Sequence, residues 1–420
     1  MIGAASPGDE RADWLRELVP LLWPAPATAT LGRARPADAV RSYLVLPSLA
    51  HPRLLVPRQT RRAAAGAVHG YGEQSSAARR AAVRLAAAAL TVGAGDVLLR
   101  DRLEVTGPQA GPHAGPHAGA QTGSEGGADT IEDHLARELG RPVLVSLHLG
   151  PARANRKPVL QLLDAGGGTV GFAKVATTAL AGRLVAAEAE TLGMLARAGL
   201  THLTPPRVLS GGSWRGLEVL VQSPLPVRQP RRPSAARLAA ATAEVAAVGG
   251  TTTQPLAGPY LAGLRERVAA LPAGPTRDGL AGALDALRPA GTELLIGSWH
   301  GDWTPWNTAV VADTVLAWDW ERFAGGVPVG FDALHYDLQP RALGRVDAAG
   351  AAAADSVRRA PGLLAPLGVP AGSAPAVAVL YLVEILTRYV GDGQTRWGNW
   401  RSMTEGVLAA ARAAAPVAAR

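Results

Sequence analysis

Residues 300–307 read H-G-D-W-T-P-W-N, and Asp319 follows twelve residues later in L-A-W-D-W-E. Phosphoryl transfer needs these group types: one carboxylate orients the attacking hydroxyl and accepts its proton, while an amide oxygen and a second carboxylate hold Mg²⁺ on the nucleotide phosphates. The spacing predicts Asp302 as the base and Asn307 and Asp319 as the Mg²⁺ ligands. The alternative is a surface loop with a chance H-G-D. The full pattern, with a short apolar strand expected at 314–317, favours the phosphotransfer loop.

Lysine is rare in this chain, which draws attention to each one. Two of the 42 Lys and Arg residues are lysines, Lys157 and Lys174. Arginine is a planar fork and lysine a compact point charge, so a site that needs the second cannot use the first. Lys174 lies in an expected strand at 170–175, after a glycine-rich turn at 165–168 that indicates a hairpin. This placement predicts that Lys174 binds phosphate.

A phosphate-binding lysine is usually held by a carboxylate on a neighbouring helix. The expected helix at 180–198 offers Glu188 and Glu190. Glu188 shares a helix face with Leu192 and Leu195, which would turn it inward, so we favour Glu188. The alternative is a solvated lysine and an exposed glutamate.

The loop at 150–158 (G-P-A-R-A-N-R-K-P) precedes this hairpin and contains Asn155 and Lys157. It has no G-x-G-x-x-G sequence. Because Asn is almost as rare here as Lys, both side chains are candidates to touch nucleotide phosphates. They are equally well explained as turn residues.

The order of expected elements predicts an α+β fold with a small β-rich lobe before a larger, mostly helical one. We place an accessory N-terminal region at 1–106, a Gly/Pro-rich linker at 107–128, a small lobe at 129–222 and a helical lobe at 223–420. The linker carries a G-P-H-A repeat, and its two histidines, His113 and His117, are weak candidates for metal binding.

These motifs together resemble the aminoglycoside phosphotransferase family, which shares its fold with protein kinases. The residues that carry the resemblance are V-G-F-A-K-V, A-A-E-A-E-T-L, L-V-Q-S-P-L, H-G-D-W-T-P-W-N and W-D-W-E, and it covers roughly 130–400. The resemblance implies a two-lobe kinase-like fold and an ATP- or GTP-dependent small-molecule kinase. About the first 125 residues fall outside it, and the role of residues 1–128 is open.

The resemblance also implies roles for single residues. The equivalent of Asp302 is the base, and those of Asn307 and Asp319 bind Mg²⁺. The equivalents of Lys174 and Glu188 form the ion pair that orders the nucleotide phosphates. The nucleotide base would bond to the backbone around Val221 and Ser223, and His300 would hold the loop rather than act as an acid or base.

Five of the ten tryptophans lie between 299 and 320, around the predicted catalytic loop. We expect Trp318 and Trp320 to point away from Asp319 into the core, and Trp303, next to the base, to be the best candidate for stacking on a sugar or ring substrate. We expect Asp332, in F-D-A-L-H-Y-D, to cap a helix rather than bind substrate.

Composition limits the remaining classes. The chain has no cysteine, so disulfides, thiolate metal sites and a cysteine nucleophile are excluded. The formal net charge of +8 is spread over 420 residues without a dense basic block, so we expect no nucleic-acid partner. The longest apolar run, 374–390, is interrupted by Glu384, and the first residues show no signal pattern, so we expect no membrane partner and a cytoplasmic location.

The acceptor is predicted only as a hydroxyl on a small molecule, with a sugar-like metabolite as one candidate. Two other classes stay open: a pseudokinase or nucleotide-binding scaffold, and a kinase that acts on a protein. The intact Lys174, Asp302, Asn307 and Asp319 argue against the scaffold. The sequence leaves the oligomeric state undetermined.

Overall fold

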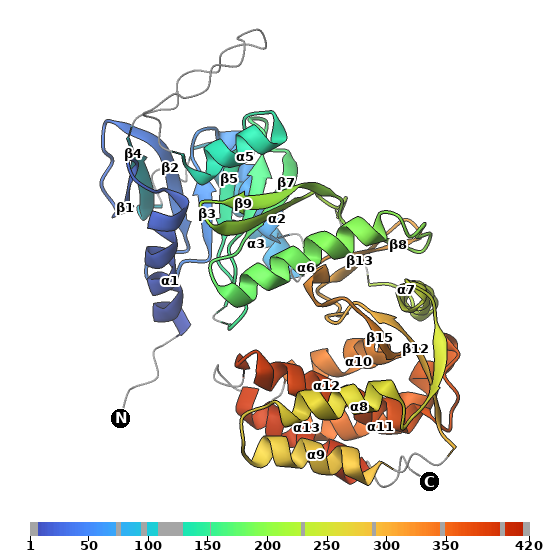
Figure 1. Cartoon of the computed structure of the whole chain (residues 1–420). Helices are drawn as coiled ribbons and strands as arrows, with labels where there is room; N and C mark the ends of the chain where they lie inside the picture. The colour runs from blue at the N-terminus through green and yellow to red at the C-terminus, as the bar shows by residue number, and fades with distance from the viewer. Residues whose placement is uncertain are drawn as a thin grey trace. The chain divides into compact units, whose positions relative to one another are not determined.

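The computed structural model describes residues 7–72, 77–93, 99–107, 129–151, 153–227, 232–287, 291–344, 349–394 and 400–414. The predicted linker, with His113 and His117, lies outside these residues apart from Gly107. The chain divides into two compact units. The first comprises Met1–Ala152, Arg156–Val185 and Val208–Pro224, and the second comprises Arg153–Asn155, Ala186–Arg207 and Leu225–Arg420. The architecture is α+β, as predicted, with a β-rich first unit and a mostly helical second one (Figure 1).

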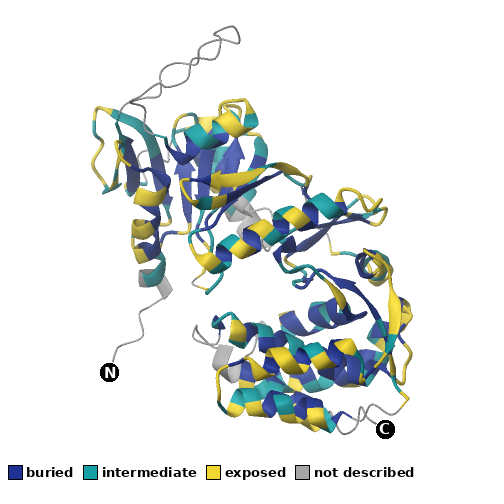
Figure 2. Cartoon of the chain, in the orientation of Figure 1, coloured by how far each residue is buried: buried dark blue, intermediate teal, exposed yellow. Residues whose placement is uncertain are grey.

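The first unit is built on one antiparallel sheet of nine strands. In spatial order the strands are β1 (Thr28–Gly32), β4 (Arg102–Thr106), β2 (Ala39–Leu46), β3 (Leu54–Pro57), β5 (Leu144–His148), β6 (Val159–Leu163), β7 (Thr169–Val175), β10 (Leu217–Gln222) and β9 (Val208–Trp214). Strand β6 is apolar at nearly every position because both faces are covered: Leu160 and Leu162 enter one core, and Leu163 enters another. Most central strands are accordingly buried (Figure 2).

The region before the linker is part of this sheet rather than a separate body. Strand β3 pairs with β5 through Leu54 opposite His148 and Leu55 opposite Leu147. The largest core of the unit also draws on both sides of the linker, from Trp14 to Val221. The expected accessory region is therefore structurally continuous with the small lobe, although the boundaries that we drew between domains stay a prediction.

Helices of the first unit cover the sheet. They are α1 (Pro7–Leu22), α2 (Arg61–Gly72), α3 (Ala77–Thr91) and α5 (Ile131–Leu139), and α6 (Ala179–Leu195) begins in this unit. Helix α1 runs through Pro20. Helix α5 begins with a capping box, in which Thr130 and Asp133 satisfy each other's backbone amides, and it ends at Gly140 in the left-handed conformation (φ 62°).

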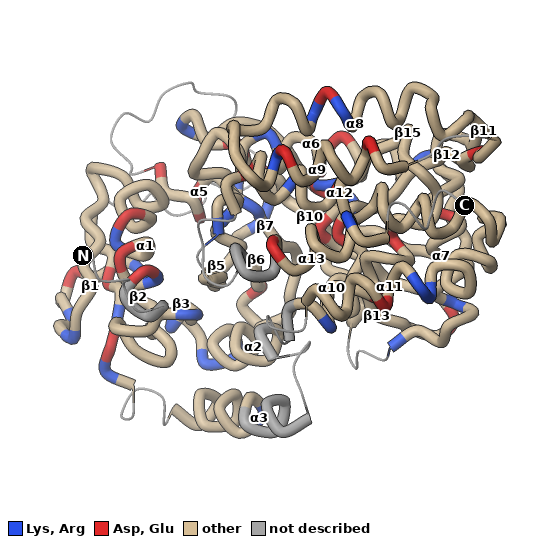
Figure 3. Tube along the Cα trace, turned by 90° about the horizontal axis from the view of Figure 1, so that it is seen from below, with Lys and Arg blue, Asp and Glu red and all other residues tan. Residues whose placement is uncertain are grey.

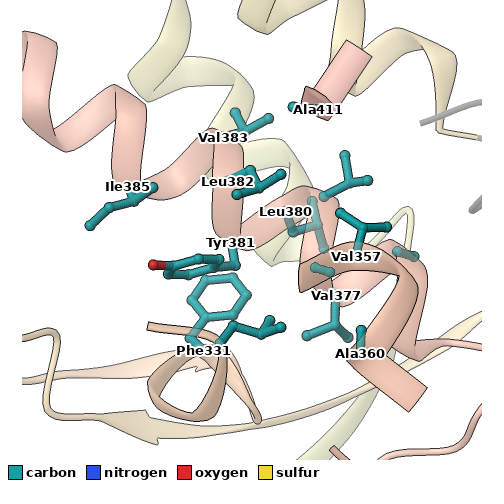
Figure 4. Close-up of a cluster of buried hydrophobic side chains, with 14 of the residues drawn as sticks. Phe331, Val357, Ala360, Val377, Leu380, Tyr381, Leu382, Val383, Ile385 and Ala411 are labelled. Carbon is teal, nitrogen blue, oxygen red and sulfur yellow. The ribbon is translucent and has the colours of Figure 1, made fainter. Parts of the chain in front are cut away.

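The second unit is a helical core with two small sheets. Its helices are α7 (Ala235–Ala247), α8 (Pro259–Ala269), α9 (Pro275–Ala286), α10 (Phe331–Gly344), α11 (Ala349–Leu364), α12 (Ala374–Gly391) and α13 (Trp400–Ala414), with a 3-10 turn, η3 (Ala365–Leu367). Helix α12 is the centre of this core. It is apolar nearly all round because α9, α10, α11 and α13 pack against it. Figure 4 shows Tyr381 of α12 beside Phe331 of α10 in this cluster.

The two small sheets of the second unit carry the predicted catalytic segments. One contains β11 (Thr252–Pro255), β12 (Glu293–Trp299) and β15 (Ala324–Pro328). The other contains β13 (Thr308–Val311), β14 (Thr314–Ala317) and β8 (Leu203–Thr204), and a 3-10 turn, η1 (Trp320–Arg322), follows β14. The predicted strand at 314–317 is thus confirmed.

One helix of the described chain, α12, is long and apolar enough to cross a membrane, and 72% of that segment is buried within the protein. A core helix of this kind needs no membrane to cover it. Basic and acidic residues both occur in each of the two units (Figure 3).

Candidate active site

A buried aspartate, Asp332, anchors the H-G-D loop. Strand β12 ends at Trp299, and the next two backbone amides both donate to Asp332, from His300 to Oδ2 at 2.7 Å and from Gly301 to Oδ1 at 3.2 Å. Gly301 adopts a left-handed conformation (φ 82°), and a Cβ there would lie 2.3 Å from the Arg322 carbonyl oxygen. Position 301 therefore requires glycine. We expected Asp332 to cap its own helix; instead both its oxygens anchor the loop.

His300 connects the H-G-D loop to the loop that carries Asp319. The imidazole is fully buried. Its Nδ1 accepts the Asp302 amide at 3.1 Å, and its Nε2 lies 3.1 Å from the Trp318 carbonyl oxygen, to which it must donate. Burial lowers the pKa of His300 to about 4, so the ring is neutral and takes the tautomer that both bonds require. His300 is a structural residue here, as the resemblance implied.

Asp302 and Asn307 face each other across the loop. The Asn307 Nδ2 group donates to the Asp302 carbonyl oxygen at 2.9 Å and to the Asp302 Oδ2 atom at 2.8 Å. Both acceptor oxygens lie on the same side of the Asn307 amide. This fixes its orientation, because in the flipped orientation the amide oxygen would face both acceptors and be repelled by them. Asn307 is buried, whereas the Asp302 side chain is 40% exposed. The loop therefore presents an accessible carboxylate beside an amide oxygen that is turned away from it.

Asp302 is held in its ionised form. Burial alone would raise the pKa of its carboxyl group, but the hydrogen bond from His335 and the nearby charge of Arg388 outweigh burial and lower that pKa well below its usual range. Arg388 comes close because its Nη1 donates to the Gly301 carbonyl oxygen at 2.6 Å. The group can orient a hydroxyl and accept its proton as the oxygen–phosphorus bond forms, when that proton becomes acidic.

Asp319 lies next to Asn307 at the open end of a hairpin. Strands β13 and β14 pair Thr308 with Ala317, and the Trp318 amide donates to the Asn307 carbonyl oxygen at 3.2 Å. Asp319 has a left-handed backbone (φ 66°, ψ 53°), which is uncommon for a residue with a side chain. Such backbone strain is frequent at functional sites.

Helix α6 reaches this same loop through Glu188. The Trp320 amide donates to the Glu188 Oε1 atom at 3.2 Å. Glu188 is fully buried and Glu190 is exposed, as the helix periodicity predicted. Glu188 therefore fixes the backbone that follows Asp319. Its ion pair with Lys174 stays a prediction.

The donor set fits a magnesium ion that is completed by phosphates. Asn307 offers its amide oxygen and Asp319 a carboxylate, and oxygen ligands of this kind suit Mg²⁺, which usually takes one or two carboxylates plus substrate phosphates. Within the part of the chain that the structure describes, there is no group of three or more His, Asp or Glu side chains that could hold a metal alone.

The remaining predicted residues belong mainly to the first unit. Lys174 is buried near the end of β7, opposite Val159 of β6 and Leu220 of β10. Val221 follows on β10, and Ser223 lies directly after that strand. These residues share the sheet, so the lysine and the predicted base-binding segment are held by neighbouring strands.

The two candidate residues of the loop at 150–158 belong to different units. Lys157 belongs to the first unit and lies in the irregular segment directly before β6. Asn155 belongs to the second unit, where its Nδ2 group donates to the Glu321 Oε1 atom at 3.3 Å, two residues beyond Asp319. Asn155 is thus close to the predicted metal ligand, and its contact to phosphate stays a prediction.

The prediction for Trp303 is wrong. Its side chain is completely buried against His300 and Trp320, at ring-centre distances of 5.4 and 6.4 Å. Trp320 is also buried, as predicted, and Trp318 is partly buried. The exposed tryptophan of the loop is Trp306, which is 42% exposed. Local spacing could not distinguish them, because the loop turns between the two positions.

Sequence reasoning also missed two residues behind Asp302. His335 on α10 contacts the carboxylate, and Tyr381 on α12 contacts His335. The one signal was the position of His335 within F-D-A-L-H-Y-D, one helical turn after Asp332. Nothing in the sequence marked Tyr381.

Comparisons with known proteins give similarity of fold. No family model matches the chain, and no curated protein matches it. Solved structures do. A thermostable mutant of an aminoglycoside phosphotransferase in complex with AMP-PNP and hygromycin B is 16% identical, with 68% of this chain and 98% of that chain covered and a TM-score of 0.44.

Two further structures are similar in the same way. A spectinomycin phosphotransferase in complex with ADP and spectinomycin is 11% identical over 68% of this chain and 97% of that one, with a TM-score of 0.41. A protein from Haemophilus somnus described as a fructosamine-3-kinase is 14% identical over 67% and 96%, with a TM-score of 0.40. The α+β order of a β-rich part before a mostly helical part agrees with the prediction from the sequence.

Proposed function

We propose that this protein is a phosphotransferase that moves the γ-phosphate of ATP or GTP to a hydroxyl group of a small molecule. One observation carries the proposal. A single loop holds the accessible Asp302 carboxylate 2.8 Å from the Asn307 amide, and that amide is oriented so that its oxygen faces away from Asp302. A base and a metal ligand are thereby fixed side by side, as phosphoryl transfer requires.

In this mechanism Asp302 orients the acceptor hydroxyl and accepts its proton during the transfer. Asn307 and Asp319 hold Mg²⁺, which supplies charge neutralisation on the nucleotide phosphates. Glu188 positions the Asp319 loop through the Trp320 amide. His300 and Asp332 keep the H-G-D loop rigid, so that the base is oriented before the substrate arrives.

Further residues are proposed to contact the nucleotide. Lys174 is proposed to bind the phosphates and to pair with Glu188, and the backbone of Val221 and Ser223 to bond to the nucleotide base. Lys157 and Asn155 are further candidates for phosphate contacts. The buried position of Lys174 on a central strand supports the first role, since a desolvated ammonium group needs an anionic partner.

The acceptor is proposed to be a small, hydroxyl-bearing, sugar-like molecule. Trp306 supports this, because it exposes an indole within the loop that carries the base, and sugar rings stack on such faces. A scaffold without activity and a kinase that acts on proteins remain the alternatives. A cytoplasmic location is part of the same proposal.

A melting experiment with Mg²⁺ tests the nucleotide site first. The wild type and Asp319→Ala are heated with ATP or GTP, each with and without Mg²⁺. A ligand at about 100 times its Kd stabilises the folded state by about 2.7 kcal/mol. We expect a Mg²⁺-dependent rise in Tm for the wild type that Asp319→Ala loses. A wild type that does not respond to either nucleotide would contradict the proposal and favour the scaffold.

A further inference from the structure

A buried polar chain leads from the helical core to the Asp302 carboxylate. His335 on α10 and Tyr381 on α12 are both completely buried. The His335 Nε2 atom lies 3.2 Å from the Asp302 Oδ1 atom, and the Tyr381 hydroxyl oxygen lies 2.9 Å from the His335 Nδ1 atom. Figure 4 shows the Tyr381 ring against Phe331, with its oxygen on the side away from Val357 and Val377.

The protonation states along this chain follow from chemistry. Burial raises the pKa of Tyr381 well above its usual range, so its hydroxyl keeps the proton. Burial also lowers the pKa of His335, so its ring is neutral, with one donor and one acceptor nitrogen. Because an ionised carboxylate can only accept, Nε2 must carry the hydrogen. Nδ1 then accepts the hydroxyl proton of Tyr381, and Tyr381 thereby fixes the tautomer.

Both carboxylate oxygens of Asp302 are therefore held by side-chain donors. Asn307 holds Oδ2 at 2.8 Å, and His335 holds Oδ1 at 3.2 Å. Rotation of the carboxylate about its Cβ–Cγ bond would lengthen both hydrogen bonds at once. The plane of the group is set while its outer side stays accessible, since the side chain is 40% exposed.

We propose that His335 is a positioning residue that fixes the orientation of Asp302 for attack by the acceptor hydroxyl, and that Tyr381 serves it by fixing its tautomer. This inference rests on the proposed function, in which Asp302 is the base. Misplacement of a reacting group by about 1 Å can cost about 100-fold in rate. A histidine that merely filled the core would have no such effect.

The test separates positioning from packing. His335→Leu combined with Tyr381→Phe removes the polar chain without leaving a buried hydroxyl or ring nitrogen unpaired, so that folding is conserved. His335→Gln restores a donor near the position of Nε2. Thr387→Val is the matched control, because it removes a buried hydroxyl from the same helix α12 whose hydrogen bond goes only to the helix backbone, at Val383.

Each variant is assayed for Tm, for Mg-ATP and Mg-GTP binding, and for nucleotide turnover with water or a hydroxyl compound as acceptor. We expect the double variant to lose about 100-fold in kcat with an unchanged KM for nucleotide. His335→Gln should recover most of this loss, and Thr387→Val should match the wild type. A double variant with wild-type kcat would overturn the positioning role of His335 but would leave the proposed function unaffected.

The tautomer is read independently of activity. In the ¹H–¹⁵N spectrum of the imidazoles, we expect a neutral His335 with hydrogen on Nε2 in the wild type, and a shift of the Nδ1 signal in Tyr381→Phe, where that nitrogen loses its hydrogen-bond donor. Hydrogen on Nδ1 in the wild type would overturn the inference even if the enzyme is active. A wild type that binds nucleotide but never turns it over would overturn the proposed function, and with it this role, whatever the tautomer.

Discussion

The buried carboxylate of Glu132 provides a quantitative test of how the N-terminal region joins the first unit. Glu132, in the first turn of α5, is buried and accepts hydrogen bonds from the Trp23 indole at 3.0 Å and from the Tyr43 hydroxyl. Arg41 lies 3.9 Å away. The donors come from the end of α1 and from β2, so one side chain connects elements on both sides of the linker.

The cost of Glu132→Ala can be worked out from these contacts. The variant leaves two buried donors, the Trp23 and Tyr43 groups, without their acceptor, at about 1–3 kcal/mol each. The expected loss is therefore about 2–6 kcal/mol, in line with about 3–5 kcal/mol for removing one partner of a buried ion pair. Since a domain is stable by about 5–15 kcal/mol in total, this is a large part of its stability.

Urea unfolding followed by tryptophan fluorescence measures this loss. Asp13→Ala is the control, because Asp13 forms an exposed ion pair with Arg16 on α1 and should cost at most about 1 kcal/mol. Glu132→Gln retains an acceptor oxygen and should lie between the two. A Glu132→Ala protein as stable as Asp13→Ala would refute the view that the N-terminal region is an integral part of this unit.

Other predictions concern the aromatic residues and pH. Trp303→Ala should lower the free energy of unfolding by about 3–5 kcal/mol in thermal or urea unfolding, because it leaves a cavity at a buried position. A variant of unchanged stability that binds the acceptor more weakly would show instead that Trp303 contacts the acceptor. Trp306→Ala should raise the acceptor KM about 3–10-fold at constant kcat, and an unchanged KM would exclude it as an acceptor contact. Burial lowers the pKa of His148 to about 4, so the unfolded chain binds more protons than the folded one between pH 6.5 and 4. The wild type should lose up to about 3 kcal/mol more than His148→Gln as pH falls through this window, and parallel Tm profiles would contradict it.

Much of the candidate site was readable from the sequence because its residues lie in short local segments. The loop from His300 to Asn307 brings the predicted base, Asp302, and the Asn307 amide together over five residues, and the β13–β14 hairpin returns Asp319 to the same place. Glu188 could be chosen over Glu190 because a helix has a fixed periodicity. In each case local geometry alone determines which residues meet.

Other features depended on contacts between distant segments. His335 and Tyr381 meet Asp302 only because α10 and α12 pack together. Helix α2 was not predicted from the sequence, because glycine has a low helix propensity when its tertiary contacts are ignored. A Cβ at Gly66 would lie 2.2 Å from the Gly167 carbonyl oxygen, and one at Gly70 would lie 2.4 Å from the Gln161 side chain. These glycines let α2 approach the sheet closely, a requirement that no local propensity reveals.

The continuity of the nine-stranded sheet was hidden for a similar reason. Strands β3 and β5 pair across about ninety residues of chain, including the linker, and neither strand carries a sequence signal for its partner. Pairing between strands so far apart is decided by burial on both faces rather than by turn chemistry. The division into accessory region and small lobe followed composition, which does not report such pairing.

The most direct test of the central claim is phosphoryl transfer itself. Wild type and Asp302→Asn are incubated with Mg-ATP or Mg-GTP and a panel of sugars, amino sugars and polyols, and products are followed by ³¹P NMR. We expect a new phosphate ester with at least one acceptor in the wild type, and a rate lower by about 100- to 10,000-fold in Asp302→Asn, with nucleotide binding retained. Ester formation at the same rate in both proteins would contradict Asp302 as the base, and the absence of ester or nucleotide turnover in the wild type would contradict the assignment as a phosphotransferase.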